Sequence, residues 1–206
     1  MGFGICLLGY LLVIVDSFGG GLIGWPLLVF GFLKLSYVKS DFKTASVLSA
    51  IAFFLSFVSI APIFDFITTD GALYKSAYAA YVALGAAVHA AYLIPLRKLT
   101  SDAGAETLAV KAATTLYFTE LYYLWALLAL FIPPLGAGVF GAGRYVTKYV
   151  AGGLNFLFLY NCFAKLTTKR QKQKEDLFLE SEKEKLAKKL QNSKKGGDKN
   201  SHDKHS

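Results

Sequence analysis

Long apolar segments separated by short polar ones run through the first 163 residues of the chain. A bilayer core about 30 Å thick takes roughly 20 apolar residues of helix to cross. Pro62, Pro95 and Pro133 each lie near the end of an apolar segment, where a missing backbone donor costs least. The pattern predicts four transmembrane helices, over residues 44–64, 73–96, 108–133 and 145–163.

Two shorter apolar segments, residues 4–15 and 22–35, precede these four. Asp16 and three consecutive glycines, residues 19–21, separate them, and each glycine costs a helix about 1 kcal/mol relative to alanine. One interpretation is a helical hairpin that crosses the membrane twice, with Asp16 in its outer turn. The other is one span followed by a re-entrant half-crossing, whose backbone must be shielded by protein or by a water-filled cavity. We favour the hairpin, which predicts about six crossings.

The composition of the chain changes sharply near residue 164. The chain is 54% hydrophobic, yet 13 of its 22 Lys and Arg residues lie in the last 42 positions. The preceding 164 residues hold too few charges to cover a water-soluble domain, which normally has about 25% charged residues. We therefore expect an all-α, polytopic transmembrane helix bundle over residues 1–164, with its first two helices short, and a basic tail over residues 165–206.

The distribution of Lys and Arg predicts the orientation of this bundle, because cytoplasmic loops hold an excess of both. The loop over residues 65–71 has no base, and residues 133–143 have no charge, although Arg144 and Lys148 follow. Bases gather instead in the two alternate loops, as Lys34, Lys39, Lys43, Arg97, Lys98 and Lys111. The alternation predicts a multi-pass plasma-membrane protein whose basic C-terminal tail is cytoplasmic.

The tail itself divides in two. Residues 169–191 favour a helix, because Leu177, Leu186 and Leu190 are spaced among Glu and Lys residues that pair at helical separation. Beyond residue 192 the composition predicts disorder. The tail lacks the interleaved aromatic residues that stack on bases, so nucleic acid is not expected as a partner. Its expected partners are anionic lipid headgroups, at about 1 kcal/mol per base near the surface, and a protein that binds residues 169–191.

Ionisable groups at membrane depth are the strongest functional signal in the sequence, since each costs roughly 2.5–3.5 kcal/mol to insert. Glu120 lies in the middle of the segment 108–133, with Tyr117 and Tyr123 three positions away on either side. That spacing predicts that the two hydroxyl groups lie on the same helical face as the carboxyl group and bond to it.

Two further segments also present polar stripes. His89 shares one helical face with Tyr78 and Tyr81, and Gly85 in the same stripe lets another helix approach. On the last segment a single face holds Arg144, Lys148 and Asn155. Polar stripes in membranes turn toward the bundle interior. The simplest arrangement joins all three in one intramembrane polar site, with Glu120 and His89 close enough to pair.

A purely structural interpretation of these residues stays open. Interior Tyr, His and Asn residues also hold transmembrane helices together by hydrogen bonds without any ligand, and Asp16 is expected to cap the edge of its loop. No cofactor or metal is predicted, because the sequence has no metal-binding Cys/His spacing and no Walker loop. Residues 136–141 match G-x-G-x-x-G but lie between two spans instead of in a βαβ unit. Cys6 and Cys162 lie in apolar segments and are expected to be buried thiols.

The opening stretch also carries a family resemblance. It reads Gly2-Phe3-Gly4-Ile5-Cys6-Leu7-Leu8-Gly9-Tyr10-Leu11-Leu12, followed by Gly24-Trp25 and Phe32-Leu33-Lys34-Leu35-Ser36. This stretch, about a fifth of the chain, resembles uncharacterised small multi-spanning membrane proteins of Gram-positive, Clostridia-type bacteria. The resemblance implies a bacterial plasma membrane and brings no activity or site residues with it.

Three functions compete at this point. A non-enzymatic membrane scaffold or regulatory subunit would use the charged tail as its contact surface, and we favour it slightly. A small-solute or proton-linked channel or transporter would use the Glu120, His89 and tyrosine stripe as its path, although no inverted repeat is apparent. An intramembrane enzyme acting on lipid is disfavoured, because the sequence has no recognisable nucleophile or metal set.

Overall fold

A computed structural model describes residues 2–16, 19–61 and 71–167 of the chain. Every element within these ranges is helical, and residues 1–164 form one compact unit. The predicted tail helix over residues 169–191 lies outside the described residues. The elements are α1 (Gly2–Ile14), α2 (Gly21–Ser36), α3 (Phe42–Ile60), α4 (Ala72–Asp102), α5 (Glu106–Phe131), η3 (Pro133–Gly136), α6 (Gly138–Cys162) and η4 (Phe163–Thr167).

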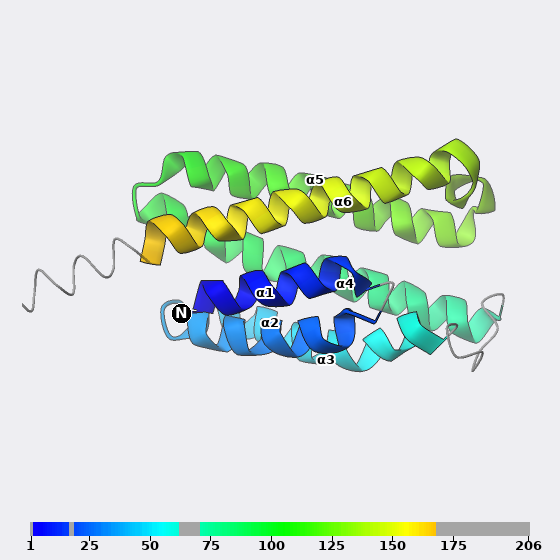
Figure 1. Cartoon of the computed structure of the whole chain (residues 1–206), viewed down its shortest axis with the longest axis horizontal. Coiled ribbons are helices and arrows are strands. Elements are labelled where there is room, and N and C mark those ends of the chain that lie inside the picture. Colours follow the sequence, from blue (N-terminus) through cyan, green and yellow to red (C-terminus); the bar gives the residue numbers. More distant parts are fainter. Residues whose placement is uncertain (1, 17–18, 62–70, 168–206) are drawn as a thin grey trace, which may run out of the picture. The chain divides into compact units, whose positions relative to one another are not determined.

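The six α-helices of the described residues pack in their order along the chain. Each contacts the helix that follows it, and α6 returns to contact α1 (Figure 1). The α2–α3 and α4–α5 connections lie at one end of the bundle, where Lys39 Nζ lies 3.5 Å from Asp102 Oδ2. We call this the α4–α5 end. The opposite end holds η3 and the start of α6, and we call it the α5–α6 end.

Three of the helices are long and apolar enough to cross a membrane, namely α3, α4 and α5. Each corresponds to a predicted transmembrane segment. The fourth predicted span corresponds to α6, which has 25 residues but holds Arg144, Lys148 and Asn155 and does not qualify by composition. The described part of the chain is therefore all-helical and compatible with a membrane.

Two boundaries differ from those expected. The last helix begins at Gly138, seven residues before the predicted start at Tyr145. A positive φ of 53° at Gly138 lets the chain turn directly from η3 into the helix. At the other end of the bundle, α4 continues through Pro95 to Asp102. Its last turns are polar and extend the helix beyond the apolar segment, to the ion pair with Lys39.

The N-terminal segments form a hairpin, but its helices are short. With 13 and 16 residues, α1 and α2 are about 20 and 24 Å long at about 1.5 Å per residue, whereas a bilayer core is about 30 Å thick. Away from the α4–α5 end, α1 ends and α2 begins well before the α5–α6 end (Figure 1). The turn lies level with Tyr81, nine residues into α4, whose hydroxyl group bonds to Asp16. The short hairpin thus leaves a recess among the longer helices.

The bundle is tightly packed on the other side of this recess. Phe32, Tyr92, Leu96 and Phe158 are all at most 2% exposed and fill the interior toward the α4–α5 end. Cys6 and Cys162 are buried there as free thiols. Large apolar side chains are also exposed on the helices, including Phe30, Phe54, Val110, Leu124 and Leu157. An exposed apolar surface of this kind is expected where lipid is the solvent.

Candidate functional site

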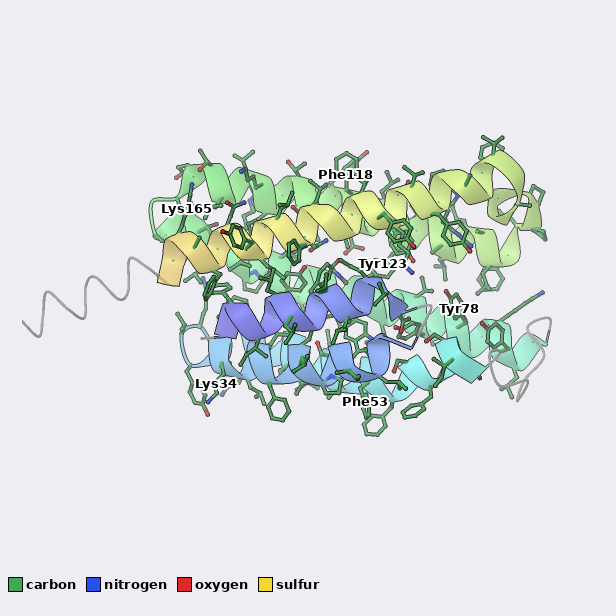
Figure 2. The ribbon with its side chains drawn as sticks, viewed as in Figure 1. Lys34, Phe53, Tyr78, Phe118, Tyr123 and Lys165 are labelled. Atoms are coloured by element: carbon green, nitrogen blue, oxygen red, sulfur yellow. The ribbon has the colours of Figure 1, made fainter. Side chains whose placement is uncertain are left out.

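A cavity of about 200 Å³ occupies the recess beyond the hairpin turn. Its charged lining residues are Asp16 and Lys148, and Ser59 and Thr119 add hydroxyl groups. The aromatic part of the wall comes from α1, α2, α4 and α5, and Figure 2 labels two of its members, Tyr78 and Tyr123. It consists of Tyr10, Trp25, Tyr74, Tyr78, Tyr81, Tyr122 and Tyr123. The wall is thus polar at a few points and aromatic over most of its remaining surface.

Hydrogen bonds from two other helices position the carboxyl group of Asp16. The Tyr81 hydroxyl donates to Oδ2 at 2.7 Å, and the Ser59 hydroxyl lies 3.3 Å from Oδ1. Tyr81 in turn accepts a hydrogen bond of 3.0 Å from the indole nitrogen of Trp25. Asp16 belongs to the turn, outside both hairpin helices, and burial raises the pKa of its carboxyl group although these donors oppose the rise. The turn residue is therefore held in one place by α2, α3 and α4.

The glycines of the turn allow this arrangement. Gly19 has a φ of 80°, which side chains other than glycine rarely adopt. A Cβ atom on Gly21 would lie 2.0 Å from Asp16 Oδ1, so only glycine leaves room for the carboxylate at the start of α2. The positive end of the helix dipole favours a carboxylate there. The expected role of Asp16 as a cap is thus compatible with its position in the cavity wall.

Lys148 reaches the same cavity from the third turn of α6 and interacts electrostatically with Asp16. This position explains why a base follows the loop that the sequence predicts to be extracellular. Arg144, one turn earlier, does not line the cavity, and its guanidinium lies 5.2 Å from the centre of the Tyr145 ring. Among the described residues, the cavity wall therefore carries one negative and one positive side chain.

Four of the nine residues predicted for an intramembrane site line this cavity: Tyr78, Tyr81, Tyr123 and Lys148. His89, Asn155, Glu120, Tyr117 and Arg144 do not. Sequence reasoning missed Asp16, Ser59 and Trp25 as members of the site. The signal that could have identified Asp16 is its place as an acidic residue between two apolar segments, each too short to cross a bilayer.

His89 lies directly behind the cavity wall and is 1% exposed. Its Nδ1 lies 2.7 Å from the carbonyl oxygen of Gly85, which only accepts, so this nitrogen carries the proton in the neutral ring. Nε2 then accepts from the Tyr10 hydroxyl at 3.2 Å. The ring also packs against Tyr123 at a centroid distance of 5.2 Å. Both nitrogens therefore bond within the bundle, and the expected pairing of His89 with Glu120 does not occur.

The sequence predicted that Gly85 lets another helix approach, and its surroundings confirm this. A Cβ atom there would lie 2.7 Å from Cε1 of the Tyr123 ring. The glycine therefore lets α5 approach α4 where both helices line the cavity.

Asn155 is completely buried and joins three helices. Its Oδ1 accepts from the Tyr92 hydroxyl on α4. Its Nδ2 donates to Thr119 Oγ1 on α5 at 2.7 Å and to the carbonyl oxygen of Ala151 at 2.9 Å. The amide group is thus occupied by its neighbours, which fits the hydrogen-bonding role that transmembrane Asn residues have between helices.

Glu120 lies apart from these residues. Its Oε1 is buried without a hydrogen-bond partner among the described residues. Tyr117 is 66% exposed on the outer face of α5, whereas Tyr123 lines the cavity. At about 100° per residue these two tyrosines lie about 120° apart, with Glu120 between them. The prediction that both hydroxyl groups bond to the carboxyl group of Glu120 is therefore wrong.

No group of three or more His, Cys, Asp or Glu side chains able to hold a metal ion occurs in the described ranges. In comparisons with known proteins, no family model, no curated protein and no solved structure matches the chain. Its described residues define an all-helical fold with membrane-compatible helices and a polar, aromatic-walled cavity.

Proposed function

We propose that this chain is a multi-pass plasma-membrane protein that takes a small polar solute into the cavity beyond the α1–α2 turn. The observation that carries this proposal is the presence of Asp16 and Lys148 in the wall of one cavity, among helices of membrane-spanning length. Ionisable residues inside a membrane protein are costly to insert and mark solute or ion pathways. Concave sites with aromatic walls and a few polar groups are typical of small-molecule binding.

The packing beside the cavity favours a carrier over an open channel. Tyr92, Leu96 and Phe158 close the bundle toward the α4–α5 end, and each is at most 2% exposed. A solute that enters the cavity meets this closed layer. Passage then requires helices to move relative to one another, as in alternating access. We therefore propose solute binding as the first step of transport.

Binding is tested with the full chain in lipid nanodiscs and a panel of small cations, anions, zwitterions and neutral polyols. A ligand present at 100 times its Kd stabilises the folded state by about 2.7 kcal/mol and raises Tm. We expect at least one class to raise Tm for the wild type. A hit is then added to proteoliposomes, where it should enter faster than into protein-free vesicles.

A cavity-filling variant provides the control. Ala151 lines the cavity, so Ala151→Leu should remove the rise in Tm. Gly153 lies two residues away on α6, and a Cβ atom there meets nothing within 4 Å. Gly153→Leu should leave the rise intact. If no class stabilises the wild type, or if Ala151→Leu responds like the wild type, the proposal is wrong.

The charge of the tail supports a second candidate, the scaffold or regulatory subunit. Residues 165–206 hold 13 Lys and Arg against 7 Asp and Glu, which suits a contact with anionic lipid or an acidic partner. Deleting residues 169–206 should then abolish salt-sensitive binding to vesicles that contain phosphatidylglycerol. If the truncated chain keeps both this binding and every protein partner of the full chain, the scaffold proposal fails.

A further inference from the structure

The outer face of α5 carries a heptad repeat of exposed apolar side chains. Four large residues recur every seven positions and are each between 55% and 66% exposed: Val110, Tyr117, Leu124 and Phe131. Positions seven apart drift by only about 20° around a helix, so the four form a single line. Three half-buried residues border this line, each three positions further along the chain: Ala113, Glu120 and Leu127. Together these residues have the spacing of a coiled-coil seam, which packs against a second helix, and we call them the α5 seam.

Glu120 brings a carboxyl group into this seam. Its Oε1 atom is buried without a hydrogen-bond partner among the described residues. The residue lies about 21 Å along α5 from Glu106 and about 17 Å from Phe131, at about 1.5 Å per residue. In a bilayer core about 30 Å thick, both lengths keep it away from water and from lipid headgroups. A carboxyl group is costly at this depth, so the partner that fits it is a hydrogen-bonding group on another protein helix.

A second copy of the chain brings such a group to the same depth. Copies inserted with the same orientation are related by a two-fold axis along the membrane normal, so their α5 helices run parallel and each seam meets itself. Glu120 of one copy then faces Glu120 of the other. A protonated carboxyl group both donates and accepts, so the two groups can bond to each other. One polar residue in an apolar seam also fixes the register of a helix pair.

We propose that two copies of this chain pair through their α5 seams, with the two Glu120 carboxyl groups hydrogen-bonded across the interface. The pair is left-handed, because a seven-residue repeat produces a supercoil of that hand. Tyr117 and Leu124 lie on either side of each Glu120 along the seam and exclude lipid from it. This pairing goes beyond solute binding and does not depend on it, because no residue of the α5 seam lines the cavity.

Disulfide formation locates the interface. Leu124 and Leu157 are matched residues, 55% and 57% exposed, but Leu124 belongs to the seam whereas Leu157 lies on α6. Each is replaced with cysteine in the full chain, in proteoliposomes treated with copper phenanthroline. Leu124→Cys should give a covalent dimer, and Leu157→Cys should remain monomeric. The native cysteines are buried, so the wild type serves as the control without a cross-link.

Energy transfer between two populations labelled at the C-terminus measures the dissociation constant of the pair in the same liposomes. Glu120→Leu should weaken pairing about tenfold, because the hydrogen bonds between the two helices are lost. Glu120→Gln should stay within about threefold of the wild type, since an amide group also donates and accepts. Leu124→Ala keeps Glu120 and should weaken pairing by removing seam contacts, whereas Leu157→Ala should leave it unchanged.

A wild-type chain that stays monomeric at every lipid dilution would overturn the pairing, as would a covalent dimer formed equally by both cysteine variants. Association of Glu120→Leu at wild-type strength would overturn the role of the carboxyl pair. Wild-type association of Leu124→Ala would place the interface on another face. Each of these outcomes leaves the solute-binding proposal intact, because that proposal is tested separately in nanodiscs.

Discussion

Replacing Asn155 with leucine should destabilise the bundle, because it leaves the buried hydroxyl group of Tyr92 without its acceptor. Leucine has the same number of side-chain heavy atoms and the same branch point, although its methyl groups are bulkier, so the main change is the loss of three hydrogen bonds. Thr119 still donates to the carbonyl oxygen of Thr115 at 2.7 Å. The Tyr92 hydroxyl, however, is left buried with no hydrogen-bond partner among the described residues.

The magnitude follows from that one hydroxyl group. A buried polar group without a partner costs about 1–3 kcal/mol, and hydrogen bonds between transmembrane helices contribute at most about 1.7 kcal/mol in double-mutant cycles. We expect Asn155→Leu to lower the free energy of unfolding by about 1–2 kcal/mol. Tyr92→Phe should cost a similar amount, because it leaves the Asn155 carbonyl oxygen without a donor.

The double variant gives the sharpest comparison. With Asn155→Leu and Tyr92→Phe together both partners are apolar, a change that is nearly neutral in general. The free energy of unfolding should therefore recover to within about 1 kcal/mol of the wild type. The assay is reversible unfolding in mixed micelles. Losses that simply add in the double variant would refute the assignment of Asn155 as a bond between helices.

Two further predictions concern stability. Gly85→Ala should cost about 1–3 kcal/mol in thermal unfolding, because the new Cβ atom would meet the Tyr123 ring at 2.7 Å. Gly153→Ala, which meets nothing within 4 Å, should be neutral or stabilising, and equal effects of the two would contradict the close approach of α5. Burial raises the pKa of the Asp16 carboxyl group, so ionisation of this group destabilises the folded state relative to the unfolded state. The free energy of unfolding of the wild type minus that of Asp16→Asn should be greatest below an aspartate's usual pKa of about 3.9 and should fall as pH rises through the folded-state pKa. A flat difference would contradict the burial of this carboxyl group.

The helices were predictable because lipid as a solvent demands long apolar segments, and the described helices follow them. The start of α6 was not predictable in this way, because Gly138, Gly141 and Gly143 are typical of a loop. Tertiary packing stabilises this turn of helix: Gly143 lies against Trp125, whose indole nitrogen donates to the Leu135 carbonyl oxygen. Propensity along the chain does not reveal such contacts.

The site was predictable only where one helix defined it. The stripe of Tyr78, Tyr81 and Gly85 follows from the period of α4 alone. The place of Asp16 depends on how far a short hairpin reaches beside a longer helix, which is a tertiary property. The prediction that both tyrosines bond to Glu120 was wrong for a geometric reason. Residues three positions before and after it are rotated by about 60° to opposite sides of the helix. Its two tyrosines therefore face different surroundings.

Whether water fills the cavity is most directly tested by thiol labelling at two adjacent positions of α4. Val82 lines the cavity, and its neighbour Ala83 is exposed on the outer face of the helix. Both lie about 15 Å from the start of α4, at about 1.5 Å per residue. The chain's two native cysteines are buried, so the unmodified protein serves as the unlabelled control.

The measurement uses a small, permanently charged methanethiosulfonate reagent on the chain in lipid nanodiscs. Such a reagent reacts only where water reaches the thiol. We expect Val82→Cys to be labelled, because the cavity brings water to this depth, and Ala83→Cys to be protected by lipid. Protection of Val82→Cys would contradict a water-filled cavity, and equal labelling of both variants would contradict the placement of this part of α4 within the membrane.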